Sequence, residues 1–479
     1  MDSDNDHQPN FSEVDLKLLE DFAFRAYREV SELRVEVKEL RIDRQLRSFP
    51  SWLVKRIKKK IKSKISNRTK NRIKPYLNCL TKLLSNTNRG KTSKSSSVNR
   101  RQKNTILLVC HSYPVNIGDY GGLPIARRVP FYKEAGYNVS VFVPSNGRLN
   151  GTVIASDGTT VHYAPLSKIE QRAKRVKAGH LAVHSPTPEI FASSRKLMLD
   201  LSTHIWIHGF EARNWRELIF DFSHEEIARR GKVLDIMNVE RQWALTELFT
   251  NPEINTIFVS EYMRSVAEDF ARTKATRSQV IHNVIDPNLF PYSPKSEDMR
   301  MNICSIRNFG RRNYATDLMS RAIFDMSRKP WFSKLSIEIY GDGRHFEEDT
   351  DPLRLLENVK LHRGFVGGKD LRKIFARSGI ALLPTRWDSQ GMLNGEAMSS
   401  GVVPVSNAVT AIPEFIGEAE GKLADPGNSN QLAMGIGELI ENPDQFLTMS
   451  LSAKERVEVQ CGPEKTVHRE IELFEKSRL

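Results

Sequence analysis

Short apolar runs alternate with amphipathic stretches from residue 104 onwards, and this alternation predicts strand, helix and strand in succession. The first unit is a strand in TILLVC, a loop in HSYPVNIGDYGG, a helix in LPIARRVPFYKEAGY and a strand in NVSVFVPS. Further predicted strands are HIWIH, TIFVS and QVIH in a first series, and MNICSI, LSIEIYG, NVKLHRG, IALLPT and VVPVS in a second. Two such series predict two doubly wound α/β domains, which bind ligands beyond the carboxyl ends of their strands.

The change from the first series to the second falls near NVIDPNLFPYSP. We therefore expect one domain over residues 104–284 and another over residues 285–458. The last segment, residues 459–479, is expected to form a helix that packs back towards the first domain.

Residues 1–43 start with the acidic stretch MDSDNDHQPN and continue into a predicted helix over residues 11–43. Apolar side chains recur in this helix at alternating intervals of three and four, the heptad pattern of a coiled coil. A homo-oligomer through residues 11–43 is one interpretation, and a helix packed on the body of the protein is the other. The positions concerned are Leu16, Leu19, Ala23, Ala26, Val30, Leu33, Val37 and Leu40.

Residues 44–103 hold 20 Lys and Arg and no Asp or Glu, so the net charge of +14 arises in this segment. An apolar stripe among its lysines predicts a basic amphipathic helix, typical of segments that lie on anionic bilayers. Charge alone would suffice for nucleic acid, so the stripe favours a membrane surface, and a solvated basic linker is the alternative. The stripe consists of Trp52, Leu53, Ile57, Ile61 and Ile65.

The 479-residue length fits two domains with appendages. No run of about 18 apolar residues occurs, so we expect neither a membrane span nor a secretory signal, and we expect a cytoplasmic protein. The cysteines lack a C-x-x-C pair, which argues against a disulfide framework and a zinc knuckle. They are Cys79, Cys110, Cys304 and Cys461.

Glycines and a histidine follow predicted strands of the first domain. Gly121 and Gly122 stand just before a helix, where backbone N–H groups attract a phosphate or another anion, although such glycines also serve as ordinary turn residues. His208 follows the strand HIWI, a position from which a side chain reaches the ligand site. A buried structural histidine is the alternative.

Three arginines follow the first strand of the second series, and guanidinium groups there could clamp a diphosphate. They are Arg307, Arg311 and Arg312, and solvated surface arginines are the alternative. Asp349 and Asp351 imitate a metal-binding D-x-D motif, but they precede a predicted helix, so we interpret them as N-capping residues and predict no metal.

The stretch PTRWDSQGMLNGEAMSSGVVPVSN places Asp388 and Glu396 eight positions apart around Gly391. It resembles the E-x7-E element of the large retaining glycosyltransferase family with a GT-B fold, often called family four or group 1. IYGDG, NVKLHRGFV, WIHGFE, FVSEYM and VIHNVIDPNLF resemble further landmarks of that family in the expected order. The resemblance covers about residues 104–479 and implies two facing Rossmann-like domains, here preceded by a helical basic N-terminal extension.

The resemblance also implies roles for particular residues. Glu396 would hold the ribose hydroxyls of a nucleotide-sugar donor, while Asp388 would contact the transferred sugar and His208 would lie beside it. The diphosphate would meet fixed cations and backbone N–H groups, and no metal or other cofactor would be needed. Those diphosphate contacts would come from Gly121, Gly122, Arg307, Arg312, Gly391, Met392 and Leu393.

Several positions depart from the family pattern. Asp388 replaces the usual Glu and is one methylene shorter, Ile306 stands where the family often has Gly, and Val284 also replaces a Gly. The family's diphosphate-binding lysine corresponds either to Arg312 or to Asn313. In the second register one cation is lost, and Arg311 or Arg312 must replace it.

These features predict a hexose transfer with retention of configuration, onto a polysaccharide or a lipid-linked glycan of the cell envelope. The enzyme would be peripheral at the inner face of the membrane. A nucleotide-sugar epimerase with the same fold and a degenerate, non-enzymatic binding protein tethered by its basic tail are the alternatives.

Overall fold

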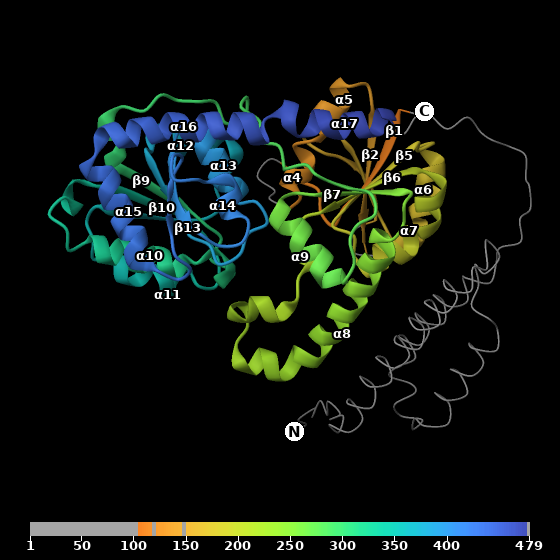
Figure 1. Ribbon diagram of the computed structural model, residues 1–479, viewed down its shortest axis with the longest axis horizontal. Coiled ribbons are helices and arrows are strands. Elements are labelled where there is room, and N and C mark those ends of the chain that lie inside the picture. Colours follow the sequence, from red (N-terminus) through yellow and green to blue (C-terminus); the bar gives the residue numbers. More distant parts are fainter. Residues whose placement is uncertain (1–103, 117–120, 146–149, 477–479) are drawn as a thin grey trace, which may run out of the picture. The chain divides into compact units, whose positions relative to one another are not determined.

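The computed structural model describes residues 104–116, 121–145 and 150–476. The predicted coiled coil and the basic amphipathic helix lie outside these residues. Two sheets with their helices make up the described part, one over residues 105–280 and one over residues 302–424 (Figure 1). The prediction of two α/β domains with parallel sheets is confirmed.

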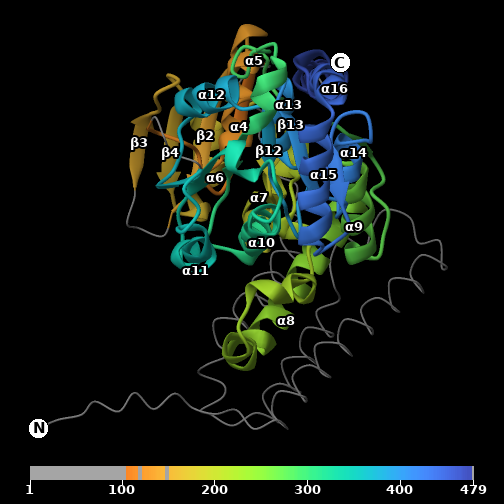
Figure 2. The same cartoon turned by 90° about the vertical axis from the view of Figure 1, so that its left-hand side faces the viewer.

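The first sheet has eight strands, and all adjacent pairs are parallel except β3 with β4 at one edge (Figure 2). In spatial order the strands are β3 (Gly151–Ile154), β4 (Thr160–Ala164), β2 (Asn138–Pro144), β1 (Thr105–Val109), β5 (His180–His184), β6 (Ser202–Ile207), β7 (Ile254–Phe258) and β8 (Ser278–Val280). The sequence pattern predicted β1, β2, β6, β7 and β8 but missed β3, β4 and β5. His180 and His184 are the first and last residues of the buried β5. These two polar residues shorten its apolar run, so the strand was not predicted.

Alternating side chains of β1 divide the first core into two faces. Leu107 and Val109 pack with α6 (Ile169–Arg175), α7 (Pro188–Asp200), α8 (His224–Phe249) and α9 (Glu261–Ala271). Ile106 and Leu108 pack on the other face with α5 (Val129–Glu134) and α17 (Val467–Lys476). Successive strand residues point to opposite faces, so a strand covered on both sides is apolar throughout.

The helix predicted over LPIARRVPFYKEAGY is divided into α4 (Leu123–Ala126) and α5. Pro130 lies in the first turn of α5, where its missing N–H removes no helical hydrogen bond. A single continuous helix would place the same proline in its interior. The division leaves Arg127 and Arg128 at the junction, and both side chains make long-range contacts.

The C-terminal helix α17 lies beside α5 and is joined to the first sheet by a buried carboxylate (Figure 1). Glu470, which is 1% exposed, accepts hydrogen bonds from Arg128 Nε at 3.1 Å, Tyr132 Oη at 2.6 Å and Trp206 Nε1 at 2.7 Å. Phe474 of the same helix is fully buried among the residues of that core. A buried carboxylate is stable only when it is paired and hydrogen-bonded in this way.

The second sheet has six parallel strands. Their order is β11 (Val359–Arg363), β10 (Ser336–Gly341), β9 (Asn302–Ile306), β12 (Ile380–Leu382), β13 (Val403–Asn407) and β14 (Lys422–Ala424). Helices α10 (Thr316–Met326) and α15 (Ser429–Glu441) cover one face, and α12 (Gly368–Arg377) and α13 (Met392–Ser399) cover the other. The remaining helices of this part are α11 (Phe346–Thr350), α14 (Ile412–Phe415) and α16 (Pro443–Cys461). The strand β14 has the sequence KLA, in which Leu423 is the one large apolar residue, and it was not predicted.

Candidate functional site

The loop from β12 to α13 is shaped by one carboxylate. Asp388 Oδ1 accepts a hydrogen bond of 2.9 Å from the backbone N–H of Gly391, the residue that caps α13. Gly391 has a φ of 74°, and a β-carbon there would lie 2.6 Å from the Ile412 side chain. The position therefore requires glycine on both conformational and steric grounds. Asp388 thus has a structural function in the loop in addition to the predicted contact with a sugar.

Glu396 lies in the second turn of α13 and is 5% exposed. Its Oε1 forms an ion pair with Arg127, the residue that follows α4 in the first domain. The Arg127 guanidinium also lies 5.1 Å from the centre of the Phe290 ring. A ligand that uses the Glu396 carboxylate must therefore share it with Arg127 or displace that side chain.

Met392 and Leu393 form the first turn of α13. Backbone N–H groups in a first helical turn have no acceptor within the helix, so they remain able to bind an anion. The prediction assigned these two residues to the donor together with Gly391, and of the three it is Gly391 that contacts Asp388.

Arg307 is a buried cation directly after β9. It is 7% exposed, and its Nη2 donates to the backbone oxygen of Leu383, at the start of the loop that carries Asp388. Its Nε has no hydrogen-bond partner among the described residues. Burial lowers the pKa of Arg307 to about 10, and the nearby Asp388 opposes this shift. The guanidinium stays charged at neutral pH and lacks a full set of partners.

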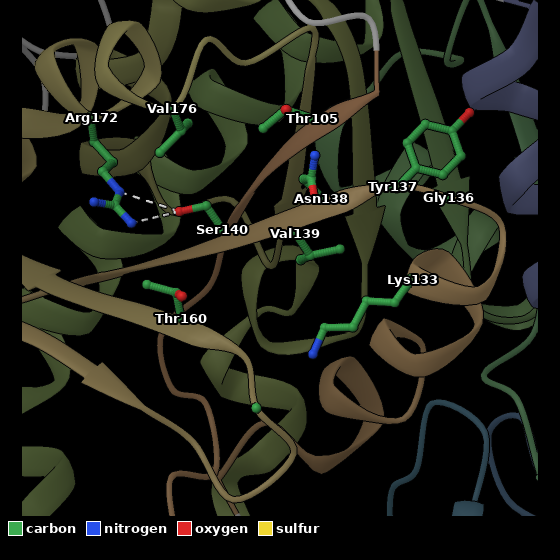
Figure 3. Close-up of a pocket in the computed structure, with 11 residues that line it drawn as sticks. Thr105, Lys133, Gly136, Tyr137, Asn138, Val139, Ser140, Thr160, Arg172 and Val176 are labelled. Atoms are coloured by element: carbon green, nitrogen blue, oxygen red, sulfur yellow. Dashed lines mark hydrogen bonds between the residues drawn. The ribbon is translucent and has the colours of Figure 1, made fainter.

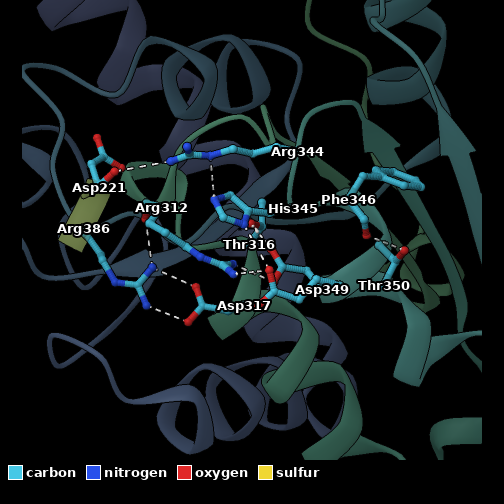
Figure 4. A network of polar contacts seen from close by, with 11 residues as sticks. Asp221, Arg312, Thr316, Asp317, Arg344, His345, Phe346, Asp349, Thr350 and Arg386 are labelled. Atoms are coloured by element: carbon cyan, nitrogen blue, oxygen red, sulfur yellow. Dashed lines mark hydrogen bonds and ion pairs between the residues drawn. The ribbon is translucent and has the colours of Figure 1, made fainter. Parts of the chain in front are cut away.

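The Arg312 guanidinium forms ion pairs with two carboxylates of its own domain (Figure 4). Its Nη1 lies 2.6 Å from Asp349 Oδ1, and its Nη2 lies 2.8 Å from Glu348 Oε2. Thr316 Oγ1 donates to the other Asp349 oxygen at 2.5 Å. Arg312 is one of the three arginines predicted to bind a diphosphate, and these two carboxylates balance its charge.

The N-capping interpretation is wrong for both Asp349 and Asp351. Asp351 is the first residue of a short 3₁₀ helix whose N-cap is Thr350. Asp349 lies inside α11, whose N-cap residue is His345, and its carboxylate contacts Arg312 and Thr316. The polar sequence around it gave no sign of this pairing, because Arg312 lies 37 positions away. Among the residues that the structure describes, no group of three or more His, Cys, Asp or Glu side chains is arranged to hold a metal ion.

Asn313, the other position that corresponds to the family lysine, is also engaged. Its Nδ2 donates to the backbone oxygen of Trp387 at 2.9 Å, and its backbone N–H donates to Asp221 Oδ1 at 3.0 Å. Asn313 therefore holds the residue before Asp388 and contributes no charge. In neither register does the structure provide a free cation at the position of the family lysine.

Arg213, in the segment after β6, is a cation that sequence reasoning missed. Its guanidinium carbon lies 4.0 Å from the centre of the Trp387 ring, next to Asp388 in the chain. Among the described residues it forms no ion pair, and its buried Nε has no hydrogen-bond partner there. Burial lowers the pKa of Arg213, Glu211 opposes that effect, and Arg311 lowers it further. Arg213 thus brings a second guanidinium to the residue that precedes Asp388, and Arg311 lies close enough to act on Arg213.

The pKa of the Tyr314 hydroxyl depends on the same charged groups. Burial raises the pKa of its hydroxyl, and the Asp388 carboxylate raises it further. Arg307, Arg311 and Arg213 act on it in the opposite direction. Three cations and one carboxylate therefore act on this hydroxyl, and two further carboxylates, Glu211 and Asp221, act on Arg213.

His208 directly follows β6 and is a neutral imidazole. Its Nε2 lies 2.9 Å from His184 Nδ1, and its backbone N–H donates to the Glu211 carboxylate. Burial lowers its pKa to about 3, and the charge of Arg128 contributes to this shift. A neutral His208 at physiological pH can accept or donate a hydrogen bond, but it cannot serve as a cationic partner of a phosphate.

Gly209, the residue after His208, has a φ of 153°. A β-carbon at Gly209 would lie 2.9 Å from the Trp387 ring. This close approach places the end of β6 against the residue that precedes Asp388. His208 and Asp388 are therefore brought to the same region, as the prediction required of residues beside one sugar.

Gly122 has a steric explanation. Its φ is 82°, and a β-carbon would lie 2.2 Å from the backbone oxygen of Ser112 in the loop after β1. A β-carbon at Gly121 would lie 3.0 Å from the Ser112 hydroxyl. The helix that follows, α4, has only four residues. Both glycines permit close packing of the loop, whatever ligand this region binds.

Residues 300–442 match the family model described as glycosyl transferases group 1. That range contains Arg307, Arg312, Asp388, Gly391 and Glu396, and so it contains the whole β12 to α13 loop. The match lies in the second half of the chain and includes β9, β12 and α13.

Two curated relatives are similar over parts of the chain. An uncharacterized 41.2 kDa protein in cps region of Klebsiella pneumoniae is 35% identical over 88 residues, which is 18% of this chain and 23% of that protein. An uncharacterized glycosyltransferase of Methanocaldococcus jannaschii is 25% identical over 256 residues, 50% of this chain and 65% of that protein. The chain thus spans between about a quarter and two thirds of these relatives.

Solved structures share the fold over a larger part of the chain. Sucrose-phosphate synthase from Thermosynechococcus elongatus has a TM-score of 0.63 at 15% identity, over 78% of this chain and 98% of that one. HepE of Anabaena, solved in complex with UDP and glucose, has a TM-score of 0.57 at 16% identity, over 78% and 99%. The described body therefore has the GT-B fold, as predicted.

Proposed function

We propose that this chain is a glycosyltransferase that moves a hexose from a nucleotide-sugar donor to a glycan acceptor. The observation that carries the proposal is the family match over residues 300–442, which includes the loop with Asp388 and the helix with Glu396. The fold and the guanidinium groups of Arg307 and Arg213 beside that loop support it.

The chemistry explains why cations belong at this place. Cleavage of a glycosyl phosphate bond leaves negative charge on the departing diphosphate, and fixed cations and N–H dipoles stabilise that charge in the transition state. Arg307, Arg311 and Arg213 provide the cations, and the first turn of α13 provides N–H groups. Arg213 replaces the family lysine in this proposal, because Arg312 and Asn313 have other partners.

Glu396 binds the ribose hydroxyls of the donor in this proposal. Its present partner, Arg127, follows the Gly121-Gly122 segment that was predicted to meet the diphosphate from the other domain. Donor binding would release Arg127 from Glu396 and allow it to turn towards the diphosphate. We propose that transfer occurs with retention of the anomeric configuration, and that neither a metal ion nor another cofactor takes part.

The acceptor proposed here is a polysaccharide or a lipid-linked glycan of the cell envelope. The description of the Klebsiella relative, which names a cps region, supports it. Residues 44–103 would hold the enzyme on the inner face of an anionic membrane, and residues 11–43 would join two or more copies. Among the described helices, none is long and apolar enough to span a bilayer.

Turnover of a panel of UDP-, GDP- and dTDP-sugars tests the proposed activity. We expect one donor to release its nucleotide in the presence of membrane glycolipids, and Asp388→Asn to retain the fold while it slows that release. NMR of the product reports the configuration of the new bond. If the wild-type chain turns over none of the donors with any acceptor fraction, or interconverts two nucleotide sugars, the proposal fails.

Deletion of residues 44–103 tests the membrane anchor separately. We expect the full chain to sediment with vesicles that contain anionic lipid and the deleted chain to remain in the supernatant. Sedimentation of both would show that the anchor lies elsewhere.

A further inference from the structure

A pocket of about 560 Å³ lies at the amino ends of the strands of the first sheet. Thr105 begins β1, Asn138 begins β2 and Thr160 begins β4, and all three line it (Figure 3). The loop after β6 and the segment after β1 leave the opposite ends of these parallel strands. The pocket is therefore separate from the donor site proposed above.

Arg172 of α6 reaches into this pocket without an acidic partner. Its Nε and Nη2 donate to Ser140 Oγ on β2, at 3.2 and 2.9 Å (Figure 3). The residue is only 8% exposed, and in the described part of the chain it forms no ion pair. Burial lowers the pKa of Arg172, and Arg175 lowers it further. A buried guanidinium without a carboxylate is unfavourable, and a bound anion would stabilise it.

Lys133 of α5 lines the same pocket and also lacks a carboxylate. Its Nζ donates to Thr159 Oγ1 at 2.8 Å and to the backbone oxygen of Asp157 at 3.1 Å. None of the residues that line the pocket is an Asp or a Glu. The pocket thus contains two cations, several hydroxyl groups and no fixed negative charge, which are the features of an anion site.

We propose that this pocket binds a small molecule that carries a phosphate group, with the phosphate at Arg172 and Ser140. The volume falls in the range of about 300–1,000 Å³ that is usual for small-molecule sites, and it exceeds what a phosphate ion alone would fill. Thr160 and Asn138 offer hydrogen bonds to hydroxyl groups of the remaining part of the ligand. A sugar phosphate and a phospholipid headgroup share this chemistry.

Isothermal titration calorimetry with glucose 6-phosphate, inorganic phosphate and glucose tests the proposal on the full chain. We expect glucose 6-phosphate to bind more tightly than phosphate, and glucose to show no heat of binding. Arg172→Gln should weaken glucose 6-phosphate by about tenfold or more, because a charge-assisted contact is lost. Lys174→Gln removes the same charge from an exposed position of the same helix and should leave the affinity unchanged.

Lys133→Gln provides a second variant if Arg172→Gln fails to fold, and it should also weaken binding. UDP at a saturating concentration should leave the affinity for glucose 6-phosphate unchanged, so that failure here is distinct from failure of the donor site. Vesicles with phosphatidic acid, compared with phosphatidylcholine vesicles for the chain without residues 44–103, distinguish a headgroup from a soluble ligand. The proposal is overturned if neither glucose 6-phosphate nor phosphatidic acid binds, or if the Arg172 and Lys133 variants bind as the wild type does.

Discussion

Replacement of Arg213 by Gln separates the proposed donor cation from an ordinary surface arginine. The change removes the charge that stacks on Trp387 at 4.0 Å and keeps a side chain of similar polarity. If the guanidinium donates one charge-assisted hydrogen bond to the leaving diphosphate, its loss costs about 1.5–3 kcal/mol. That cost corresponds to a decrease of about 10- to 150-fold in kcat/KM for the donor.

Arg216→Gln is the matched control for this experiment. Arg216 also lies over a tryptophan, 5.0 Å from the Trp215 ring, but it pairs with Asp235 at the surface. An exposed pair of this kind contributes about 0–1 kcal/mol to stability, so the variant should retain wild-type kinetics.

The assay is steady-state turnover of the active donor, with a thermal shift by UDP as a check on binding. We expect Arg213→Gln to lose the kcat/KM stated above and most of the UDP shift, while Arg216→Gln keeps both. A kcat/KM within twofold of the wild type for Arg213→Gln would refute the assignment of this cation to the diphosphate.

Three further predictions concern stability. Glu470→Ala leaves the buried Arg128 without its carboxylate and should lower the free energy of unfolding, measured in urea, by about 3–5 kcal/mol. The control Glu472→Ala breaks an exposed ion pair and should lower it by less than about 1 kcal/mol. Equal effects of the two variants would contradict the buried contact. Gly122→Ala should destabilise clearly more than Gly136→Ala, which has the same positive φ but open space around it, and equal thermal shifts would contradict the steric argument. His208 is easier to protonate in the unfolded chain, so its contribution to the free energy of unfolding should fall as pH decreases from 6.5 towards 3, and a slope unchanged in His208→Gln would contradict this.

The sequence predicted the elements that rest on local pattern. Strands such as β1 and β9 are apolar runs bounded by polar turns, and the β12 to α13 loop is marked by Gly391 between two acids. Hydrophobic periodicity can be read from the sequence, and so can the glycine that a positive φ favours. These features were found for that reason.

Ion pairs between residues far apart in the chain cannot be read from the sequence. Arg312 meets Asp349, 37 positions away, and was predicted to be free for a diphosphate, while Arg127 meets Glu396 across 269 positions. Arg213 lies beside the loop that carries Asp388 only because the segment after β6 packs against Trp387. Charges in a sequence show which groups are present, but only the fold shows which of them neutralise one another.

The central claim is that the β12 to α13 loop and its arginines bind a nucleotide sugar. Equilibrium binding of UDP-, GDP- and dTDP-sugars to the wild-type chain and to Glu396→Gln tests it most directly. The account predicts that one nucleotide class binds the wild type and that Glu396→Gln weakens it by about tenfold or more, the loss of one hydrogen bond to a charged group. Equal affinity of the two proteins for every nucleotide sugar, or no binding by either, would contradict it.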